Sequence, residues 1–409
     1  MKINQKILWL LLAGFLGVFG CTSTAPDATD TDATDTPSGN NPTLEPSGVE
    51  PEAICDEAGL VKQKGKNIFG VIEIGSSGVK SEVLQKLPST ESDGTFDLEP
   101  REENIEPRDV DPIDPTAQTA TVAAVSEVFA EMQKQFAIPC EHIVLYGSSG
   151  FASKAHHKEA LIKEIKTEIG RNVDLISEEE EAIYVFEAVV PSHRIDDVVM
   201  LDIGSGNTKS AYLDGNSIEA PRSTFSIDFG TKSFTKAVND SKGEPDFTAA
   251  AEALKDEELA PAIQAVLASH PSVENKNRVY LAGGISWALT NLTRPCGIEQ
   301  VITADDELPS KFSPLSAEDI NTFYINVTRD PETLFSPDLS DCDAEKAEKV
   351  QEDIEIIRGK VFELEELEGG AEVLRALSSE MEFADKDAIF FSSYAIEALP
   401  LGYLKQQLN

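Results

Sequence analysis

The feature that most constrains this chain is a pattern that occurs twice: a buried strand, a glycine-rich turn and a second strand. The first copy spans 67–87, with the turn Gly75-Ser76-Ser77-Gly78, and the second spans 198–213, with the turn Gly204-Ser205-Gly206-Asn207. Apolar runs that flank such turns predict hairpins, because glycine is the default residue of tight turns. An internal repeat of this kind predicts two similar domains.

Apolar residues recur at helical spacing along much of the chain around the two hairpins. The predicted helices lie at 116–136, 154–169, 177–189 (opening at Ser177 with capping-box spacing), 246–269 and after Gly283-Gly284. Further strands are predicted at 143–147, 173–176, 279–282 and 388–391, and the acidic, proline-rich segment 89–115 is predicted to loop outward. The rest of the chain to Asn409 is expected to be mostly helical. This alternation predicts the α/β class.

The charge of the chain excludes one large class of partners. With 73 acidic and 34 basic residues, the 409-residue chain has a formal net charge of -39. A nucleic-acid binder needs a basic footprint, so this charge argues against DNA or RNA. It also opposes docking on anionic lipid, and it fits high external salt, where self-repulsion is screened over a few ångström. The length allows two or three domains.

The N-terminus has the organisation of an export signal. Lys2 and Lys6 precede an apolar run at 7–19 that is too short to span a bilayer, and Cys21 follows. These features are typical of a bacterial lipoprotein signal over residues 1–20, with Cys21 as the lipidated residue. An ordinary signal peptide that contains a cysteine is the alternative. We expect a membrane-anchored, extracytoplasmic protein, either periplasmic or at the cell surface.

The segment after Cys21 fits a tether. Residues 22–54 include seven Asp or Glu and no Lys or Arg, and they are rich in Thr, Pro, Ser and Gly. Such a composition does not bury enough apolar surface to offset chain entropy, so 21–61 is predicted to be a disordered linker.

Four cysteines remain beyond Cys21, at positions 55, 140, 296 and 342. Outside the cytoplasm an even count permits two disulfides, with three connectivities, and four buried thiols are the alternative. No pair of these cysteines has zinc-finger spacing.

Four short segments carry more information together than any one of them does alone, since a lone glycine turn is usually only a turn. They are Glu73-Ile-Gly-Ser-Ser-Gly78, Ile176-Ser-Glu-Glu-Glu-Glu-Ala182, Asp202-Ile-Gly-Ser-Gly-Asn-Thr208 and Leu281-Ala-Gly-Gly-Ile-Ser286. In this order they resemble the motifs of the exopolyphosphatase/guanosine pentaphosphate phosphohydrolase (Ppx/GppA) family of the actin-like ATPase superfamily. The resemblance covers about residues 67–405. It implies two actin-like (ribonuclease H-like) domains, 62–190 and 191–405, facing a central cleft.

The resemblance also implies roles for single residues. Glu181 falls on the family's catalytic base, which orients and deprotonates the attacking water. Asp202 and Glu73 fall on carboxylates that serve Mg²⁺ or another divalent cation. The phosphate-binding positions are Gly75, Ser76, Gly204, Ser205, Gly206 and Lys209, and Gly283-Gly284 matches a nucleotide-type glycine motif. Glu180 is the capping-box partner of Ser177, so we assign it no chemistry.

The sequence departs from the family pattern at several of these positions. Glu73 stands in place of the usual Asp, and Ser77-Gly78 in place of Asn-Ser. Lys209 stands where the family usually has a Glu, which reverses a charge, although its ammonium can neutralise phosphate. Ala152 lies near the usual phosphate-binding Arg, with Lys154 close by.

Two functions therefore stay open. The first is a phosphoric anhydride hydrolase that releases terminal phosphate from polyphosphate or a phosphorylated compound by metal-assisted attack of water. The second is a catalytically weak relative that binds a phosphorylated ligand or a protein outside the membrane. In both, the partners are the phosphorylated molecule and, through the lipid anchor, the membrane; a homodimer stays open.

The resemblance bears on the disulfides as well. In an actin-like domain the strands at 67 and 143 are parallel neighbours, which implies a Cys55–Cys140 disulfide and leaves Cys296 to pair with Cys342.

Overall fold

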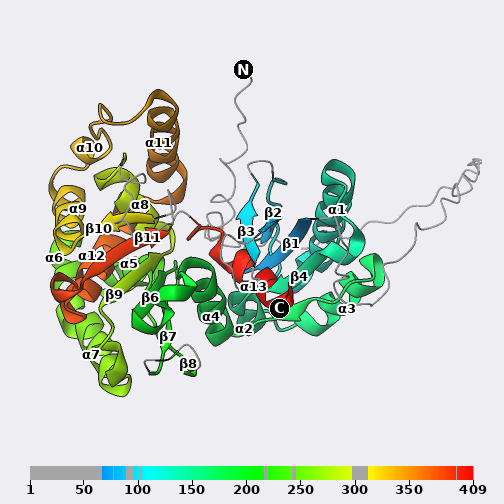
Figure 1. The fold of residues 1–409 in the computed structure, drawn as a ribbon, viewed down its shortest axis with the longest axis horizontal. Coiled ribbons are helices and arrows are strands. Elements are labelled where there is room, and N and C mark those ends of the chain that lie inside the picture. The colour runs from blue at the N-terminus through cyan, green and yellow to red at the C-terminus, as the bar shows by residue number, and fades with distance from the viewer. Residues whose placement is uncertain are drawn as a thin grey trace, which may run out of the picture.

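The computed structural model describes residues 67–76, 78–88, 96–101, 104–215, 217, 220–241, 246–296, 312–392 and 394–408. Two β-sheets with helices packed on them lie side by side, and helices α4 (Glu178–Val189) and α13 (Ala398–Leu408) lie between them (Figure 1). The α/β class predicted from the sequence is confirmed.

The first sheet has the strand order β3-β2-β1-β4-β5. Its strands are β1 (Ile68–Gly75), β2 (Gly78–Pro88), β3 (Phe96–Pro100), β4 (Ile143–Gly147) and β5 (Asp174–Leu175). Strand β1 pairs antiparallel with β2 and parallel with β4, so it is the central strand. Its sequence Ile-Phe-Gly-Val-Ile-Glu-Ile-Gly is almost continuously apolar because both of its faces are covered. Gly75 and Gly78 close the first hairpin.

The second sheet has the order β10-β11-β9-β6-β7-β8. Its strands are β6 (Val198–Ile203), β7 (Thr208–Leu213), β8 (Arg222–Ile227), β9 (Arg278–Ala282), β10 (Phe312–Leu315) and β11 (Ala388–Ser392). Strand β6 repeats the position of β1, since it pairs antiparallel with β7 and parallel with β9. The internal repeat read from the two glycine turns is therefore a repeat of sheet topology.

Helices cover both sheets. The remaining ones are α1 (Gln118–Phe136), α2 (Ser149–Lys154), α3 (Lys158–Ile169), α5 (Thr231–Ser241), α6 (Phe247–Leu254), α7 (Ala260–Ser269), α8 (Gly284–Thr293), α9 (Ala317–Arg329), α10 (Pro331–Leu334), α11 (Ala344–Ile356) and α12 (Leu364–Glu380). Two π-helical turns follow α6 and α11, at Lys255–Leu259 and Ile357–Val361.

Three strands and one helix break differ from the sequence expectation. Strands β3, β8 and β10 were not predicted; β3 and β10 contain proline and lie at sheet edges, so pairing with a neighbour creates them rather than their own propensity. The helix expected over 154–169 is two helices, α2 and α3, separated at 155–157.

The two central helices, α4 and α13, pack on different sheets. Helix α4 precedes the second sheet in the chain and buries Ala182, Val185 and Phe186 in the core of that sheet. Helix α13 follows the second sheet but packs Leu401, Tyr403 and Leu404 against the first sheet. The domain boundaries expected near residues 190 and 405 stay a prediction, since each of these helices lies at the junction of the two halves.

Cys296 and Cys342 form a disulfide with a Cα–Cα distance of 5.1 Å, as the resemblance implied. Cys140 is also disulfide-bonded, and its expected partner, Cys55, lies outside the described residues, as do Cys21, the signal segment and the linker. Within the part of the chain that the structure describes, no helix has the length and apolar character needed to cross a membrane.

The contact between α4 and α13 makes a first prediction. A methyl group at Gly402 of α13 would overlap the backbone carbonyl of Tyr184 on α4. We expect Gly402→Ala to lower the free energy of unfolding by about 3 kcal/mol, because backbone atoms have no room to move apart. Urea unfolding measures this. Gly359→Ala is the matched control, since a methyl there meets no atom within 4 Å, and an equal effect of both changes would refute the close contact.

Candidate functional site

Four successive glutamates at the start of helix α4, residues 178–181, differ in their burial and in their contacts. Ser177 and Glu180 form the predicted capping box: the Ser177 amide donates to Glu180 Oε2 at 2.7 Å, and the Glu180 amide donates to Ser177 Oγ at 3.2 Å. Glu179 is exposed. Glu181 lies on the opposite side of the helix and is only 3% exposed. The cap thus fixes the helix so that Glu181 is the buried carboxylate of the four, while the partly buried Glu178 accepts a hydrogen bond from Asn207.

Two groups from different halves of the molecule hold Glu181. The backbone N–H of Ser149, at the start of α2, donates to Glu181 Oε1 at 2.7 Å. The Lys209 ammonium on β7 donates to Glu181 Oε2 at 2.6 Å. Together the two contacts fix the orientation of the carboxylate.

Lys209 also forms an ion pair with a second carboxylate, that of Asp202. Asp202 and Lys209 face each other across the β6–β7 ladder, and Lys209 Nζ lies 3.7 Å from Asp202 Oδ2. Burial would lower the pKa of Lys209, but Asp202 and Glu181 together raise it, so the side chain stays an ammonium. Burial raises the pKa of Asp202, and the charge of Lys209 offsets part of that rise. The result is a buried row of carboxylate, ammonium and carboxylate.

The first hairpin turn lies beside the start of α2. The Ser148 amide donates to the carbonyl of Ile74 at 3.0 Å, and a methyl at Gly150 would lie 3.5 Å from Ser76 Oγ. Sequence reasoning missed Ser149 as a donor, although a signal was present: Gly147-Ser148-Ser149-Gly150 repeats the four residues of the first turn. Both copies follow a strand of the first sheet, so the structure brings them together.

The second hairpin turn is anchored by the start of α5. The amide of Thr231 donates to the carbonyl of Gly204 at 3.0 Å, and the amide of Lys232 donates to the carbonyl of Ser205 at 2.8 Å. In a trans peptide the C=O and N–H point in opposite directions. The N–H groups of Ser205 and Gly206 therefore point away from α5, on a part of the turn that is exposed. They are suited to bind an anion.

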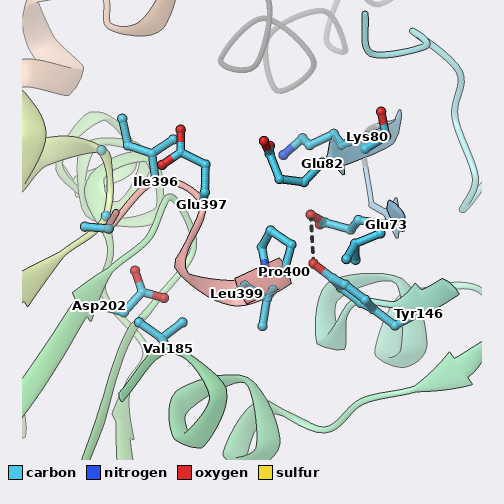
Figure 2. Close-up of a pocket in the computed structure, with 15 residues that line it drawn as sticks. Glu73, Lys80, Glu82, Tyr146, Val185, Asp202, Ile396, Glu397, Leu399 and Pro400 are labelled. Carbon is cyan, nitrogen blue, oxygen red and sulfur yellow. Dashed lines mark hydrogen bonds between the residues drawn. The ribbon is translucent and has the colours of Figure 1, made fainter. Parts of the chain in front are cut away.

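A cavity of about 200 Å³ lies between the two halves (Figure 2). Glu73, Lys80, Glu82 and Tyr146 line it from the first sheet, and Asp202 lines it with Gly283 and Gly284 from the second. Its lining therefore unites four of the predicted site positions, while Glu181, Lys209 and the two hairpin turns are not part of it. The predicted arrangement of two halves facing one cleft is supported.

Glu73 and Asp202 do not share a cation site. The Tyr146 hydroxyl donates to Glu73 Oε2 at 3.4 Å, and Figure 2 shows this pair on one side of the cavity, with Leu399 and Pro400 between it and Asp202. Asp202 is instead paired with Lys209. Within the described ranges, no three His, Cys, Asp or Glu side chains are grouped so that they could hold a metal ion. These side chains as arranged do not fit the divalent cation that the resemblance implied.

The glycine pair at 283–284 has a structural reason of its own. Gly283 has φ +88°, and a methyl there would overlap the carbonyl of Ile203 on β6. The close approach of α8 to β6 thus requires glycine at this position. Nucleotide binding by the pair stays a prediction.

Comparison with known proteins bears on this geometry. Residues 111–284 match the model of the Ppx/GppA phosphatase family. The matched stretch contains Glu181, Asp202 and Lys209, but not the first hairpin. None of the curated proteins matches the chain.

Solved structures show the fold. The chain is similar to a Ppx/GppA phosphatase of Aquifex aeolicus, with 16% identity and a TM-score of 0.52 over 84% of this chain and 100% of the other. It is also similar to an exopolyphosphatase-like protein, with 14% identity and a TM-score of 0.52 over the same shares. The predicted actin-like fold is confirmed.

The cavity also holds two carboxyl groups that sequence reasoning missed. Glu82 on β2 is 3% exposed and accepts a hydrogen bond from Asn104 Nδ2 at 2.8 Å. Burial raises the pKa of Glu82 well above its usual range, and Glu397, in the segment before α13, raises it further. Burial also raises the pKa of Glu397. No motif marks either residue, because the topology alone brings them to one cavity.

These raised pKa values predict a pH dependence of stability. A carboxyl whose pKa is higher in the folded than in the unfolded state stabilises the fold below its unfolded pKa, and this stabilisation is lost as pH rises through the folded pKa. We expect Glu82→Gln to lose less stability than the wild type between pH 5 and pH 8 in urea unfolding. Glu179→Gln removes an exposed carboxylate instead and should follow the wild type. A Glu82→Gln curve parallel to the wild type would contradict the prediction.

Proposed function

We propose that this protein is a phosphohydrolase that releases terminal phosphate from polyphosphate or another phosphorylated compound. The observation that carries the proposal is the placement of Glu181, a buried carboxylate held by the Ser149 N–H of one half and by Lys209 of the other. The family match over 111–284 supports phosphohydrolase chemistry in general. The substrate and the details of mechanism are our inference.

The residues suit in-line attack by water. Glu181 would orient a water molecule and take one of its protons as the water oxygen bonds to the terminal phosphorus. The bridging P–O bond then breaks, and the shortened chain leaves with the bridging oxygen. The N–H groups of Ser205 and Gly206 and the Lys209 ammonium would neutralise the phosphoryl oxygens.

A second candidate is a protein that binds the phosphorylated ligand without efficient turnover. One observation favours it: both oxygens of Glu181 already accept a hydrogen bond, one from the Ser149 N–H and the other from Lys209. Calorimetry with tripolyphosphate, beside a phosphate-release assay, separates the two candidates, since a binder gives heat of binding without product.

The hydrolase proposal makes a direct prediction. Glu181→Gln keeps the size of the side chain but removes the base, so phosphate release from polyphosphate by the full chain should fall at least ~100-fold. Glu179→Gln is the matched control, because Glu179 belongs to the same run of glutamates but is exposed. Equal activity of wild type and Glu181→Gln would rule out Glu181 as the base.

We also propose that the protein is an extracytoplasmic lipoprotein and that its partners are the phosphorylated molecule and the membrane. The sequence of residues 1–61 supports this, through its basic start, apolar run, Cys21 and acidic linker. A homodimer remains compatible with the proposal, whereas the charge of -39 argues against nucleic acid.

The anchor has its own test. Cys21→Ala should move the protein from the membrane fraction to the soluble fraction, or leave it unprocessed, because the acidic linker has no affinity for lipid. Cell fractionation with an antibody to the folded part measures this. If the variant stays with the membranes as the wild type does, the lipoprotein proposal is wrong.

A further inference from the structure

We infer that the Lys209 ammonium is a built-in replacement for the divalent cation, so that the site works without a metal ion. This inference rests on the proposed function for its catalytic part, but its central claim concerns which cation Glu181 and Asp202 hold. That claim is testable on the protein whether or not it hydrolyses phosphate.

The first argument is position. Lys209 Nζ lies 2.6 Å from Glu181 Oε2 and 3.7 Å from Asp202 Oδ2. A divalent cation bound by the same two oxygens would lie about 2.0–2.6 Å from each. The ammonium and such an ion would therefore occupy the same space, and one excludes the other.

The second argument is burial. The side chains of Glu181, Lys209 and Asp202 are 4%, 14% and 17% exposed. Without a metal ion, moving Lys209 aside would leave Glu181 as a buried charge without a counter-ion, which is strongly unfavourable, so the ammonium is held in place and a metal ion would have to displace it. The backbone of the lysine is also fixed: β7 lies between β6 and β8, and the hydroxyl of the preceding Thr208 donates to the carbonyl of Phe229 at 2.8 Å.

The third argument is charge. Two carboxylates and one ammonium carry a net charge of -1, as do three carboxylates around a divalent cation. A lysine in place of a third carboxylate thus reproduces the charge of a loaded metal site without the metal. An ammonium also has three N–H donors. One of them is donated to Glu181, and Asp202 lies 3.7 Å away as an ion-pair partner, so the ammonium has donors left for a phosphoryl oxygen.

The test measures the binding of Mn²⁺, the only metal ion added, to the purified full chain. Electron paramagnetic resonance detects the bound ion. Lys209→Met removes the ammonium and keeps the length of the side chain, and Lys209→Glu adds a third carboxylate. We expect at least ~10-fold tighter Mn²⁺ binding by Lys209→Met than by the wild type, and tighter binding still by Lys209→Glu. Adding Asp202→Asn to either variant should abolish the gain.

Lys236→Met is the matched control for net charge. Lys236 forms an exposed ion pair with Asp240 on α5, so this variant also removes one lysine beside a carboxylate, but on the surface. The Lys236→Met variant should not gain a tight Mn²⁺ site. If Lys236→Met gains as much as Lys209→Met, the effect is one of overall charge and the inference fails.

The wild type alone also decides the question, so the result does not depend on whether a Lys209 variant folds. Mn²⁺ binding by the wild type that Asp202→Asn removes would show that a metal displaces Lys209, and this would overturn the inference. In the activity assay, phosphate release by the wild type should be unchanged in excess EDTA, and loss of release in EDTA would also overturn it. Absence of release under all conditions would refute the proposed function and leave the Mn²⁺ result to decide the inference.

Discussion

The packing of helix α13 against helix α4 fixes how the two sheets face each other. Gly402 allows the backbones of the two helices to meet at Tyr184, three residues from Glu181. Helix α4 packs on the second sheet and α13 on the first, so this contact is the main joint between the halves. The position of Glu181 relative to the start of α2 follows from it, and so does the cavity that Figure 2 shows.

A chain with a charge of -39 must still bury carboxyl groups at its cleft, and it does so in two ways. Glu181 and Asp202 are paired with the Lys209 ammonium, and Glu181 also accepts a hydrogen bond from a backbone N–H. At Glu82 and Glu397 burial is the largest influence and raises both pKa values, which favours the neutral form, and the charge of Lys349 offsets only part of the rise at Glu397. The carboxyl groups paired with a lysine of the site are therefore the two beside the hairpin turns.

Periodicity and turn chemistry predicted the two hairpins, the capping box and the strands at 143–147 and 198–203, because each depends on residues close together in the sequence. The edge strand β10 depends on pairing with a distant segment and contains proline, so no local sequence pattern predicts it. The same distinction holds in the site. Glu181 was found through a motif, whereas its partner Ser149 and the pairing of Lys209 with both carboxylates depend on the tertiary fold. The resemblance implied a cation between carboxylates, and the structure supplies the cation from a strand.

The chain passes between the two halves at two places, just before α4 and in the segment between β11 and α13 (Figure 1). Each connection leads into one of the two central helices, α4 or α13. Glu181 lies in the second half, together with Lys209 and Asp202, whereas the Ser149 N–H belongs to the first. The Ser149–Glu181 hydrogen bond therefore joins the two halves, while the Glu181–Lys209 ion pair lies within one of them. The orientation of this carboxylate thus depends on how the two halves are placed relative to each other.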